Sequence, residues 1–163
     1  HRLLKGISPI LGQYNYILID CPPSLNMLTV NALVAANSVL IPMQCEYYAL
    51  EGLTGLLGTI EKLKLINKKL TIEGLLRTMY DGRNLLSQQV SEQLTTHFGD
   101  KVYETIIPRN VRLAEAPSHG LPVVLYDRNS AGASAYRALA DEFIERQEKE
   151  IQEQEQQATL EVA

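Results

Sequence analysis

Short apolar runs alternate with longer stretches of helical period along this chain. Strands are expected where aliphatic residues follow one another, at 16–19, 38–41, 72–79, 102–107 and 123–125. Helices are expected where apolar residues recur every three or four positions, at 25–36, 50–65, 87–98 and about 131–145. Prolines at 22, 23 and 42 are expected to end the first two strands. The alternation predicts an α/β fold, a mostly parallel β-sheet with helices on both faces.

Candidate chemistry gathers where these strands end. A parallel sheet binds ligands at the carboxyl ends of its strands. Asp20 closes the first apolar run, Thr78 and Met79 lie at the end of the third, and Pro108 follows the fourth. A carboxylate at the tip of a buried strand needs a cation or hydrogen-bond donors, and in phosphate-handling proteins the cation is often Mg²⁺. From the spacing alone, Asp20 serves equally well as a cap for the following turn.

Composition limits the classes of protein to consider. The 163 residues are 45% hydrophobic and 21% charged, which is typical of one folded domain. No apolar run approaches the roughly 18 residues of a membrane span, and the first residues do not resemble a secretory signal. Two cysteines and three histidines without CxxC or HxxxH spacing indicate neither a disulfide framework nor a zinc site. We therefore expect a cytoplasmic protein.

The net charge of −4 is unevenly distributed. Residues 141–163 hold eight acidic and two basic side chains, whereas residues 1–140 hold 13 basic and 11 acidic ones. The acidic balance therefore gives no argument against a nucleic-acid partner. We expect a domain over 1–144 and a Glu/Gln-rich tail over 145–163, either a helical extension or disordered.

Several segments carry a family resemblance. The segments are DCPPSL (20–25), LIPMQCEYYALEGL (40–53), TMYDGRNLLSQQV (78–90), HFGDKVYETIIPRNVRLAEAPSHGLPV (97–123) and YDRNSAGASAY (126–136). Together they closely resemble the ParA/Soj partitioning ATPases, which belong to the deviant Walker P-loop group of ParA and MinD. The likeness extends from Tyr14 to Glu142 and implies a P-loop NTPase-like fold.

The resemblance also implies roles for individual residues. Asp20 corresponds to the Walker B acid, which holds Mg²⁺ through water. Cys21, Pro22, Pro23 and Ser24 correspond to the switch that senses the γ-phosphate. The adenine would lie between Pro108 and Asn110 on one side and Thr78 and Met79 on the other.

The resemblance further implies that Arg83, Arg109 and Arg112 meet DNA phosphates. Arg77 adds a further cation nearby. The alternative is that these arginines are solvated or pair with acids such as Glu115. Gly82 and Asn84 replace the Ala and Thr that commonly flank the corresponding arginine in the family.

The glycine-rich loop that cradles the phosphates in this group, KGGxGKT, does not occur in the sequence. The glycines before Asp20, Gly6 and Gly12, have no Lys-Ser or Lys-Thr after them. We therefore interpret the chain as a carboxyl-terminal portion that lacks the P-loop and the first strand, and expect it to be inactive alone. The parent would be an ATPase that uses ATP and Mg²⁺. It would form an ATP-dependent homodimer, bind DNA non-specifically on the nucleoid, and respond to a ParB-type centromere-binding protein, without a membrane partner.

Three other functions have weaker support. The first is a catalytically incompetent module that binds DNA or protein without ATP turnover. An iron–sulfur reductase of the nitrogenase iron-protein type would need cluster-ligating cysteines, and Cys21 and Cys45 match poorly. A hydrolase triad built on Ser118-His119 lacks the GxSxG turn.

Overall fold

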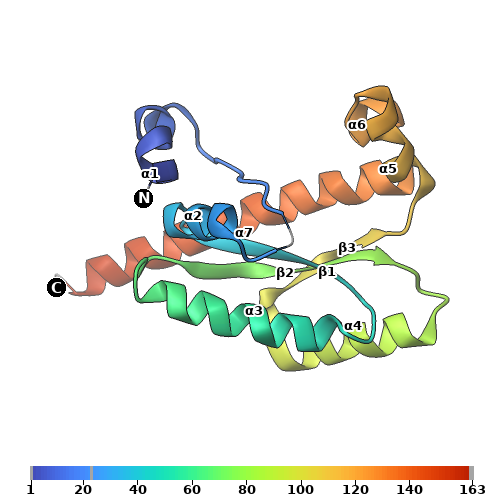
Figure 1. Cartoon of the computed structure of the whole chain (residues 1–163), viewed down its shortest axis with the longest axis horizontal. Coiled ribbons are helices and arrows are strands. Elements are labelled where there is room, and N and C mark those ends of the chain that lie inside the picture. Colours follow the sequence, from blue (N-terminus) through green and yellow to red (C-terminus); the bar gives the residue numbers. More distant parts are fainter. Residues whose placement is uncertain (1, 23, 162–163) are drawn as a thin grey trace. The chain divides into compact units, whose positions relative to one another are not determined.

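The computed structural model describes residues 2–22 and 24–161 and shows a three-stranded sheet accompanied by helices (Figure 1). The strands β1 (Ser38–Gln44), β2 (Thr71–Tyr80) and β3 (Val102–Pro108) are hydrogen-bonded in the order β1–β2–β3, and β2 and β3 are parallel. The helices are α1 (Arg2–Ile7), α2 (Met27–Ala35), α3 (Ala49–Lys64), α4 (Leu85–Phe98), α5 (Val111–Glu115), α6 (Val123–Tyr126) and α7 (Ala131–Glu161). Short 3₁₀ turns are η1 (Ser8–Gln13), η2 (Gly99–Lys101) and η3 (Ala116–His119). The predicted α/β class is confirmed.

The chain divides into two compact units, the first made of residues 1–41 and 48–74 and the second of residues 42–47 and 75–163. In the first unit, Asn26 caps α2 by accepting hydrogen bonds from the N–H groups of Leu28 (2.9 Å) and Thr29 (3.2 Å). At the other end of α2, the Asn67 amide donates to the carbonyls of Leu33 (3.0 Å) and Ala36 (2.8 Å). Both ends of the helix are thus satisfied by asparagine side chains.

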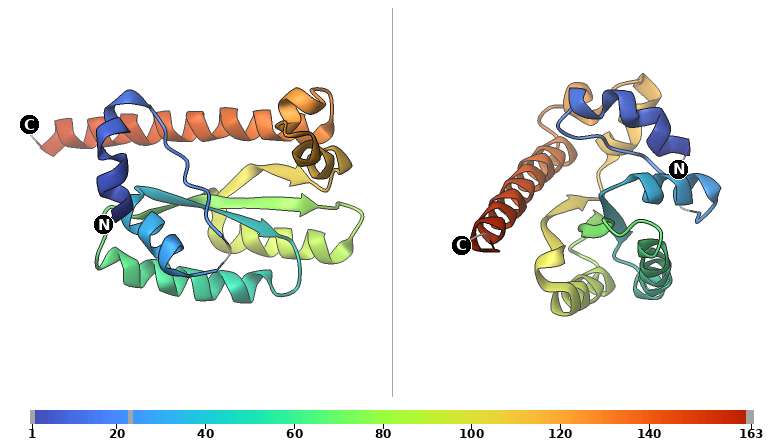
Figure 2. Two further views of the ribbon diagram at one scale, coloured as in Figure 1. Left: turned by 45° about the horizontal axis from the view of Figure 1, so that its top comes forward. Right: turned by 90° about the vertical axis from the view of Figure 1, so that its left-hand side faces the viewer.

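The second unit includes α4, α7 and β3, with β3 between the two helices (Figure 2). Its buried apolar residues include Leu75, Leu76, Val90, Leu94, Tyr103 and Ile107. A smaller cluster of Ala116, Val123 and Ala133 is covered by Leu113, Val124 and Tyr126. This cluster holds α5, α6 and the start of α7 together.

The register between β2 and β3 is irregular in two places. Leu75 lies opposite Val102 and Arg77 opposite Ile106, so that β3 uses two more residues than β2 over this interval. Beyond it, Tyr80 lies opposite Pro108, and here β2 uses one residue more. This extra residue falls in the interval that contains Met79, whose backbone φ of 49° is unusual for a residue other than glycine.

The predictions of strands at 16–19 and 123–125 are wrong. Residues 16–20 have no regular structure, and Tyr16 and Leu18 are 43% and 85% exposed. A strand forms only when a neighbour receives its hydrogen bonds, and within the described ranges no strand pairs with this run. Residues 123–125 lie in helix α6, because the Pro122 carbonyl accepts hydrogen bonds from the N–H groups of Leu125 (2.9 Å) and Tyr126 (3.0 Å).

One boundary also differs from expectation. Strand β1 continues through Pro42 to Gln44 instead of ending at the proline. Proline is tolerated on an outer strand, where its missing N–H removes no sheet hydrogen bond, and β1 is an outer strand of the described sheet. For the Glu/Gln-rich segment after residue 145, the expected alternatives were a helical extension and disorder, and the structure shows the helical extension, since α7 runs on to Glu161.

Candidate functional site

The carboxyl ends of β2 and β3 form the candidate site in the second unit. Tyr80 lies opposite Pro108, and the Arg109 N–H donates to the Tyr80 carbonyl over 3.0 Å. The loops that leave the two strands are therefore tied together immediately after their last residues. All four residues expected to contact a base lie at this edge: Thr78, Met79, Pro108 and Asn110.

Asn110 has a local structural role that the sequence analysis did not assign. Its Oδ1 accepts a hydrogen bond from the Arg112 N–H (3.0 Å) and thereby caps α5. Among the described residues its Nδ2 group has no hydrogen-bond partner. The cap fixes the orientation of the amide plane, and an oriented amide presents two donor hydrogens to a ligand.

The loop between β2 and α4 holds a close ion pair. The Arg83 guanidinium lies 2.9 Å from Asp81 Oδ2, and the Arg83 N–H also donates to Asp81 Oδ1 (3.1 Å). These hydrogen bonds, assisted by the charge of Arg109, lower the pKa of Asp81 to about 2. The Arg83 side chain is nonetheless 91% exposed, so that it can reach an anion in solution.

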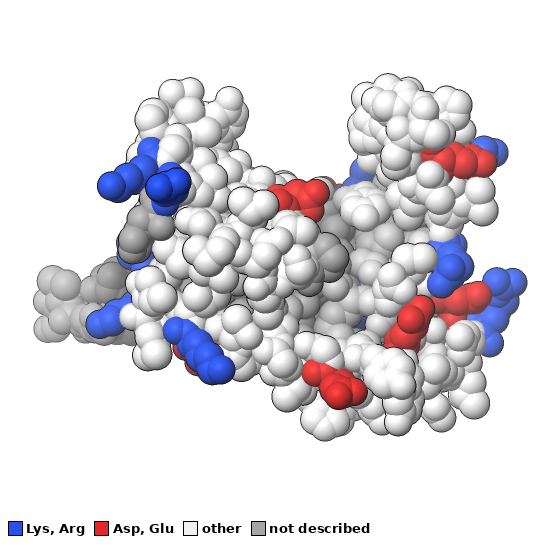
Figure 3. Space-filling view, in the orientation of Figure 1, with Lys and Arg blue, Asp and Glu red and all other residues white. Residues whose placement is uncertain are grey.

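Arg112 is paired more extensively than Arg83. Its guanidinium lies 2.8 Å from Glu115 and 3.3 Å from Asp127, and the pair with Glu115 raises the arginine pKa. The interpretation of the arginines as partners of nearby acids thus describes both Arg83 and Arg112 in this structure. Figure 3 shows acidic and basic side chains next to one another at the right of the view, and basic side chains with few acids beside them at the left.

Arg77 is not the additional surface cation that we expected. Its guanidinium donates to Ser91 Oγ (2.9 Å) and to the carbonyls of Tyr103 (2.7 Å) and Glu104 (3.2 Å). Its Nε is buried without a hydrogen-bond partner among the described residues. The side chain therefore joins β2 to α4 and β3 inside the second unit. The sequence gives no sign of this role, which depends on the irregular register of β3.

The expected metal and switch residues belong to the first unit. Asp20 is exposed at the end of the extended run instead of at the tip of a buried strand, and Cys21 is also exposed. Ser24 adjoins the start of α2: its carbonyl accepts a hydrogen bond from Thr29 Oγ1 (2.7 Å). Pro22 precedes this turn, and Pro23 lies outside the described residues.

The described residues are compatible with a Mg²⁺ ion that is held mainly by water and substrate phosphates. Within residues 2–22 and 24–161, no three His, Cys, Asp or Glu side chains gather as a metal cage. Magnesium usually keeps several waters and takes one or two carboxylates together with substrate phosphates. A single accessible carboxylate such as Asp20 fits that mode of binding.

Across residues 2–22 and 24–161, no helix is both long and apolar enough to cross a membrane.

Comparisons with known proteins agree on a class. A family model described as "AAA domain" matches residues 1–72. The crystal structure of the cell division ATPase MinD from Pyrococcus furiosus superposes with a TM-score of 0.70 at 25% identity, over 88% of this chain and 57% of that one. Cobyrinic acid a,c-diamide synthase from Mycobacterium smegmatis, with bound ATP analogue and magnesium, gives a TM-score of 0.67 at 34% identity, over 85% and 50%. The fold is that of the P-loop NTPases.

Curated relatives narrow the class to one family. The chain is 58% identical over 150 residues to the chromosome partitioning protein ParA of Caulobacter vibrioides, covering 90% of this chain and 56% of that protein. It is 56% identical over 142 residues to the sporulation initiation inhibitor protein Soj of Bacillus subtilis, covering 86% and 56%. The chain belongs to the ParA/Soj family of partitioning proteins, and it spans little more than half the length of these relatives.

Proposed function

We propose that the chain is the carboxyl-terminal portion of a ParA/Soj-type partitioning ATPase. In the complete protein, ATP hydrolysis would accompany formation of a homodimer, non-specific DNA binding on the nucleoid in the cytoplasm, and stimulation by a ParB-type partner. The observation that carries the proposal is the identity of 56–58% to relatives named ParA and Soj. The meeting of four expected base-contact residues at one sheet edge supports it.

The base would bind at the carboxyl ends of β2 and β3. Pro108 and Met79 supply apolar surface from the two neighbouring strands, and Met79 is 43% exposed. Asn110, oriented by its hydrogen bond to α5, would donate its free Nδ2 hydrogens to ring nitrogens of adenine. Burying an amide already held in place costs less conformational entropy than ordering a free one.

Asp20 and the residues after it would serve the phosphate end of the nucleotide. Bound Mg²⁺ would neutralise charge on the transferred phosphoryl group, and Asp20 would orient it by accepting hydrogen bonds from its water ligands. Ser24 contacts Thr29 on α2, and Asn26 caps the same helix. A displacement of residues 21–24 by the γ-phosphate would therefore be passed directly to α2.

ATP hydrolysis by a chimera tests the enzymatic part of the proposal. The chimera joins the amino-terminal portion of Caulobacter ParA to this chain, and the variant Asp20→Asn is compared with Asp141→Asn, an exposed acid on α7. We expect Asp20→Asn to lower kcat by about 10-fold or more, because the metal loses its positioning carboxylate, and Asp141→Asn to leave it unchanged. Equal activities of the two variants would contradict the role of Asp20.

An experiment on the 163-residue chain alone helps to distinguish the two functions that the sequence leaves open, an ATPase and a module that binds DNA or protein without ATP turnover. Equilibrium dialysis with ATP should show weak or no binding, since the sequence contains no phosphate-cradling glycine loop. If the chimera also lacks nucleotide binding while the chain binds DNA or a protein, the non-catalytic module replaces the ATPase.

DNA binding is tested separately on the same chimera. Arg83→Glu should weaken binding to unrelated DNA sequences to the same degree and reduce its salt dependence, because a phosphate contact carries no sequence information. Lys149→Glu, an equal charge change on an exposed position of α7, is the matched control. Unchanged affinity of the Arg83 variant would remove Arg83 from the DNA surface.

A further inference from the structure

Strand β3 lies at one margin of the described sheet. On one side it pairs with β2, and its other side has no neighbouring strand among the described residues. Its sequence, VYETIIP, is rich in β-branched and aromatic residues. An outer strand of this composition is a ready template for a strand of another molecule, because its backbone N–H and C=O groups are available in a row.

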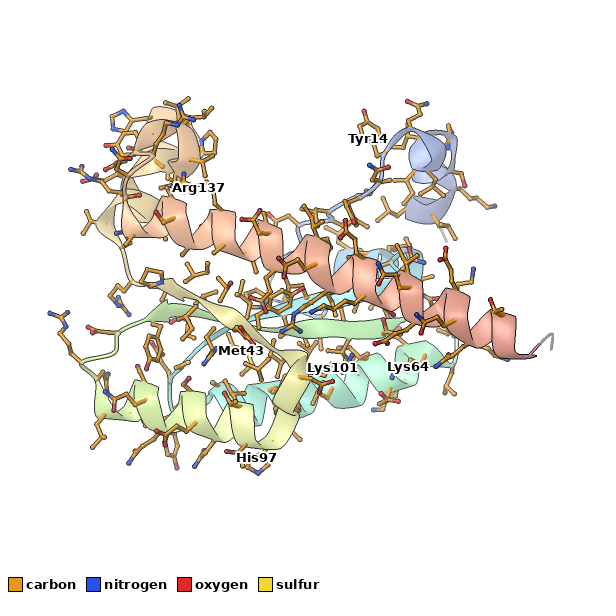
Figure 4. All side chains as sticks on the ribbon, turned by 180° about the vertical axis from the view of Figure 1, so that it is seen from behind. Tyr14, Met43, Lys64, His97, Lys101 and Arg137 are labelled. Atoms are coloured by element: carbon orange, nitrogen blue, oxygen red, sulfur yellow. The ribbon has the colours of Figure 1, made fainter. Side chains whose placement is uncertain are left out.

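In the second unit, α7 runs along β3 and contacts it closely (Figure 4). The Glu142 carboxylate accepts hydrogen bonds from two consecutive backbone N–H groups, those of Glu104 (2.8 Å) and Thr105 (2.8 Å). The hydrogen bonds outweigh the effect of burial and lower the pKa of Glu142. One side chain thus takes two backbone donors of β3, which are then not available to another strand.

Arg146, one turn further along α7, takes one acceptor of β3 and one of the turn η2 that precedes it. Its guanidinium donates to the carbonyls of Asp100 (2.8 Å) and Val102 (3.0 Å) and pairs with Glu142 at 2.8 Å. It also lies over the Tyr103 ring, with 4.1 Å between the guanidinium carbon and the ring centroid. The two side chains hold each other in place, and both are largely shielded from solvent.

The irregular register of β3 is what makes this contact possible. Successive N–H groups of a regular strand point to opposite sides, whereas those of Glu104 and Thr105 both reach Glu142. The two extra residues of β3 fall in this interval. From β2, Arg77 binds the carbonyls of Tyr103 and Glu104. The backbone groups of the irregular segment are therefore hydrogen-bonded by charged side chains from two elements, Arg77 of β2 and Glu142 of α7.

We propose that Glu142 and Arg146 form an edge clasp that closes β3 against strand pairing with a second copy of this chain. The clasp replaces the hydrogen bonds of a neighbouring strand by those of two helix side chains. Its role does not depend on nucleotide or DNA, and it keeps the margin of the sheet from extending between molecules.

The test uses the full 163-residue chain with Glu142→Ala and Arg146→Ala combined. Amide hydrogen exchange at Glu104 and Thr105 should become at least about 10-fold faster, because both N–H groups lose their acceptor. Light scattering should show self-association that increases with protein concentration. Adding Glu104→Pro to this variant should abolish the association, since proline blocks pairing at an outer strand.

The matched control combines Asp141→Ala and Lys149→Ala, which also removes one acid and one base from exposed positions of α7. It should retain the wild-type exchange and oligomeric state. If the clasp variant loses helical circular dichroism, Glu142→Gln replaces it, because it keeps the helix but only one acceptor oxygen. One of the two amides should then exchange about 10-fold faster. The proposal is wrong if the two amides stay protected, if the control associates equally, or if association persists with proline at position 104.

Discussion

The contact between α5 and the first turn of α7 leaves no room for a Cβ atom at position 132 unless the Leu113 side chain moves. A Cβ atom placed on Gly132 would lie 2.6 Å from Cγ of Leu113 and 2.9 and 3.1 Å from its two Cδ atoms. All three distances are shorter than ordinary carbon contacts, and Cγ cannot move away without rotation of the whole side chain. Leu113 covers the buried cluster of Ala116, Val123 and Ala133, so that its rotation would uncover that cluster.

Gly132→Ala should therefore destabilise the second unit. Overpacking costs about 1–3 kcal/mol, and the better helix propensity of alanine returns less than about 1 kcal/mol, because position 132 is only the second residue of α7. We expect a net loss of about 1–2 kcal/mol in the free energy of unfolding, measured by urea denaturation. Gly58→Ala is the control: it lies within α3 with no atom near its Cβ and should stabilise by up to about 1 kcal/mol.

A double-mutant cycle shows whether Leu113 is the cause. In a Leu113→Ala background the new methyl group has space, so that Gly132→Ala should cost nothing there. An equal cost of Gly132→Ala in both backgrounds, or no cost in the wild type, would refute the packing argument.

Three further predictions concern single side chains. The Asp81 pKa of about 2 lies below the ordinary value of about 3.9, so its pair with Arg83 should persist at pH 4 and be lost as the pH falls toward 2, as followed by NMR of the carboxyl carbon. Cys21 is exposed and should react quickly with Ellman's reagent, whereas burial raises the pKa of Cys45, which should react only on unfolding. Arg77→Met should lower the stability to urea by about 1.5–3 kcal/mol, because hydrogen bonds from a charged group are lost, without the loss of DNA affinity expected for Arg83→Glu.

The sequence correctly predicts the elements whose apolar periodicity can be recognised within one continuous segment, without reference to distant residues. Helix α3 and strand β2 were expected at 50–65 and 72–79 and lie at Ala49–Lys64 and Thr71–Tyr80. The run at 16–19 has an equally apolar sequence, but a strand also requires a neighbour, which the run itself does not encode. The run at 123–125 is too short for its period to distinguish strand from helix.

In the candidate site, too, the sequence predicts what depends on local pattern and does not predict contacts between distant segments. Thr78 and Pro108 could be placed together because neighbouring parallel strands end at the same margin of a sheet, and the structure brings them to one edge. The partner of Arg77 could not be foreseen, because its acceptors are backbone carbonyls of β3. Carbonyls occur at every position, so that a sequence does not mark the ones that lack a strand partner.

The two irregularities of the sheet together determine which residues meet at the candidate site. Regular pairing continued from Leu75 and Val102 would place Tyr80 opposite the residue before Pro108, and the observed register moves β3 by one position. A shift of one residue is about 3.3 Å along the strand and turns each side chain to the other face. The left-handed backbone of Met79 provides the compensating residue on β2. The position of the expected base-contact residues therefore depends on backbone geometry that side chains outside the site hold in place.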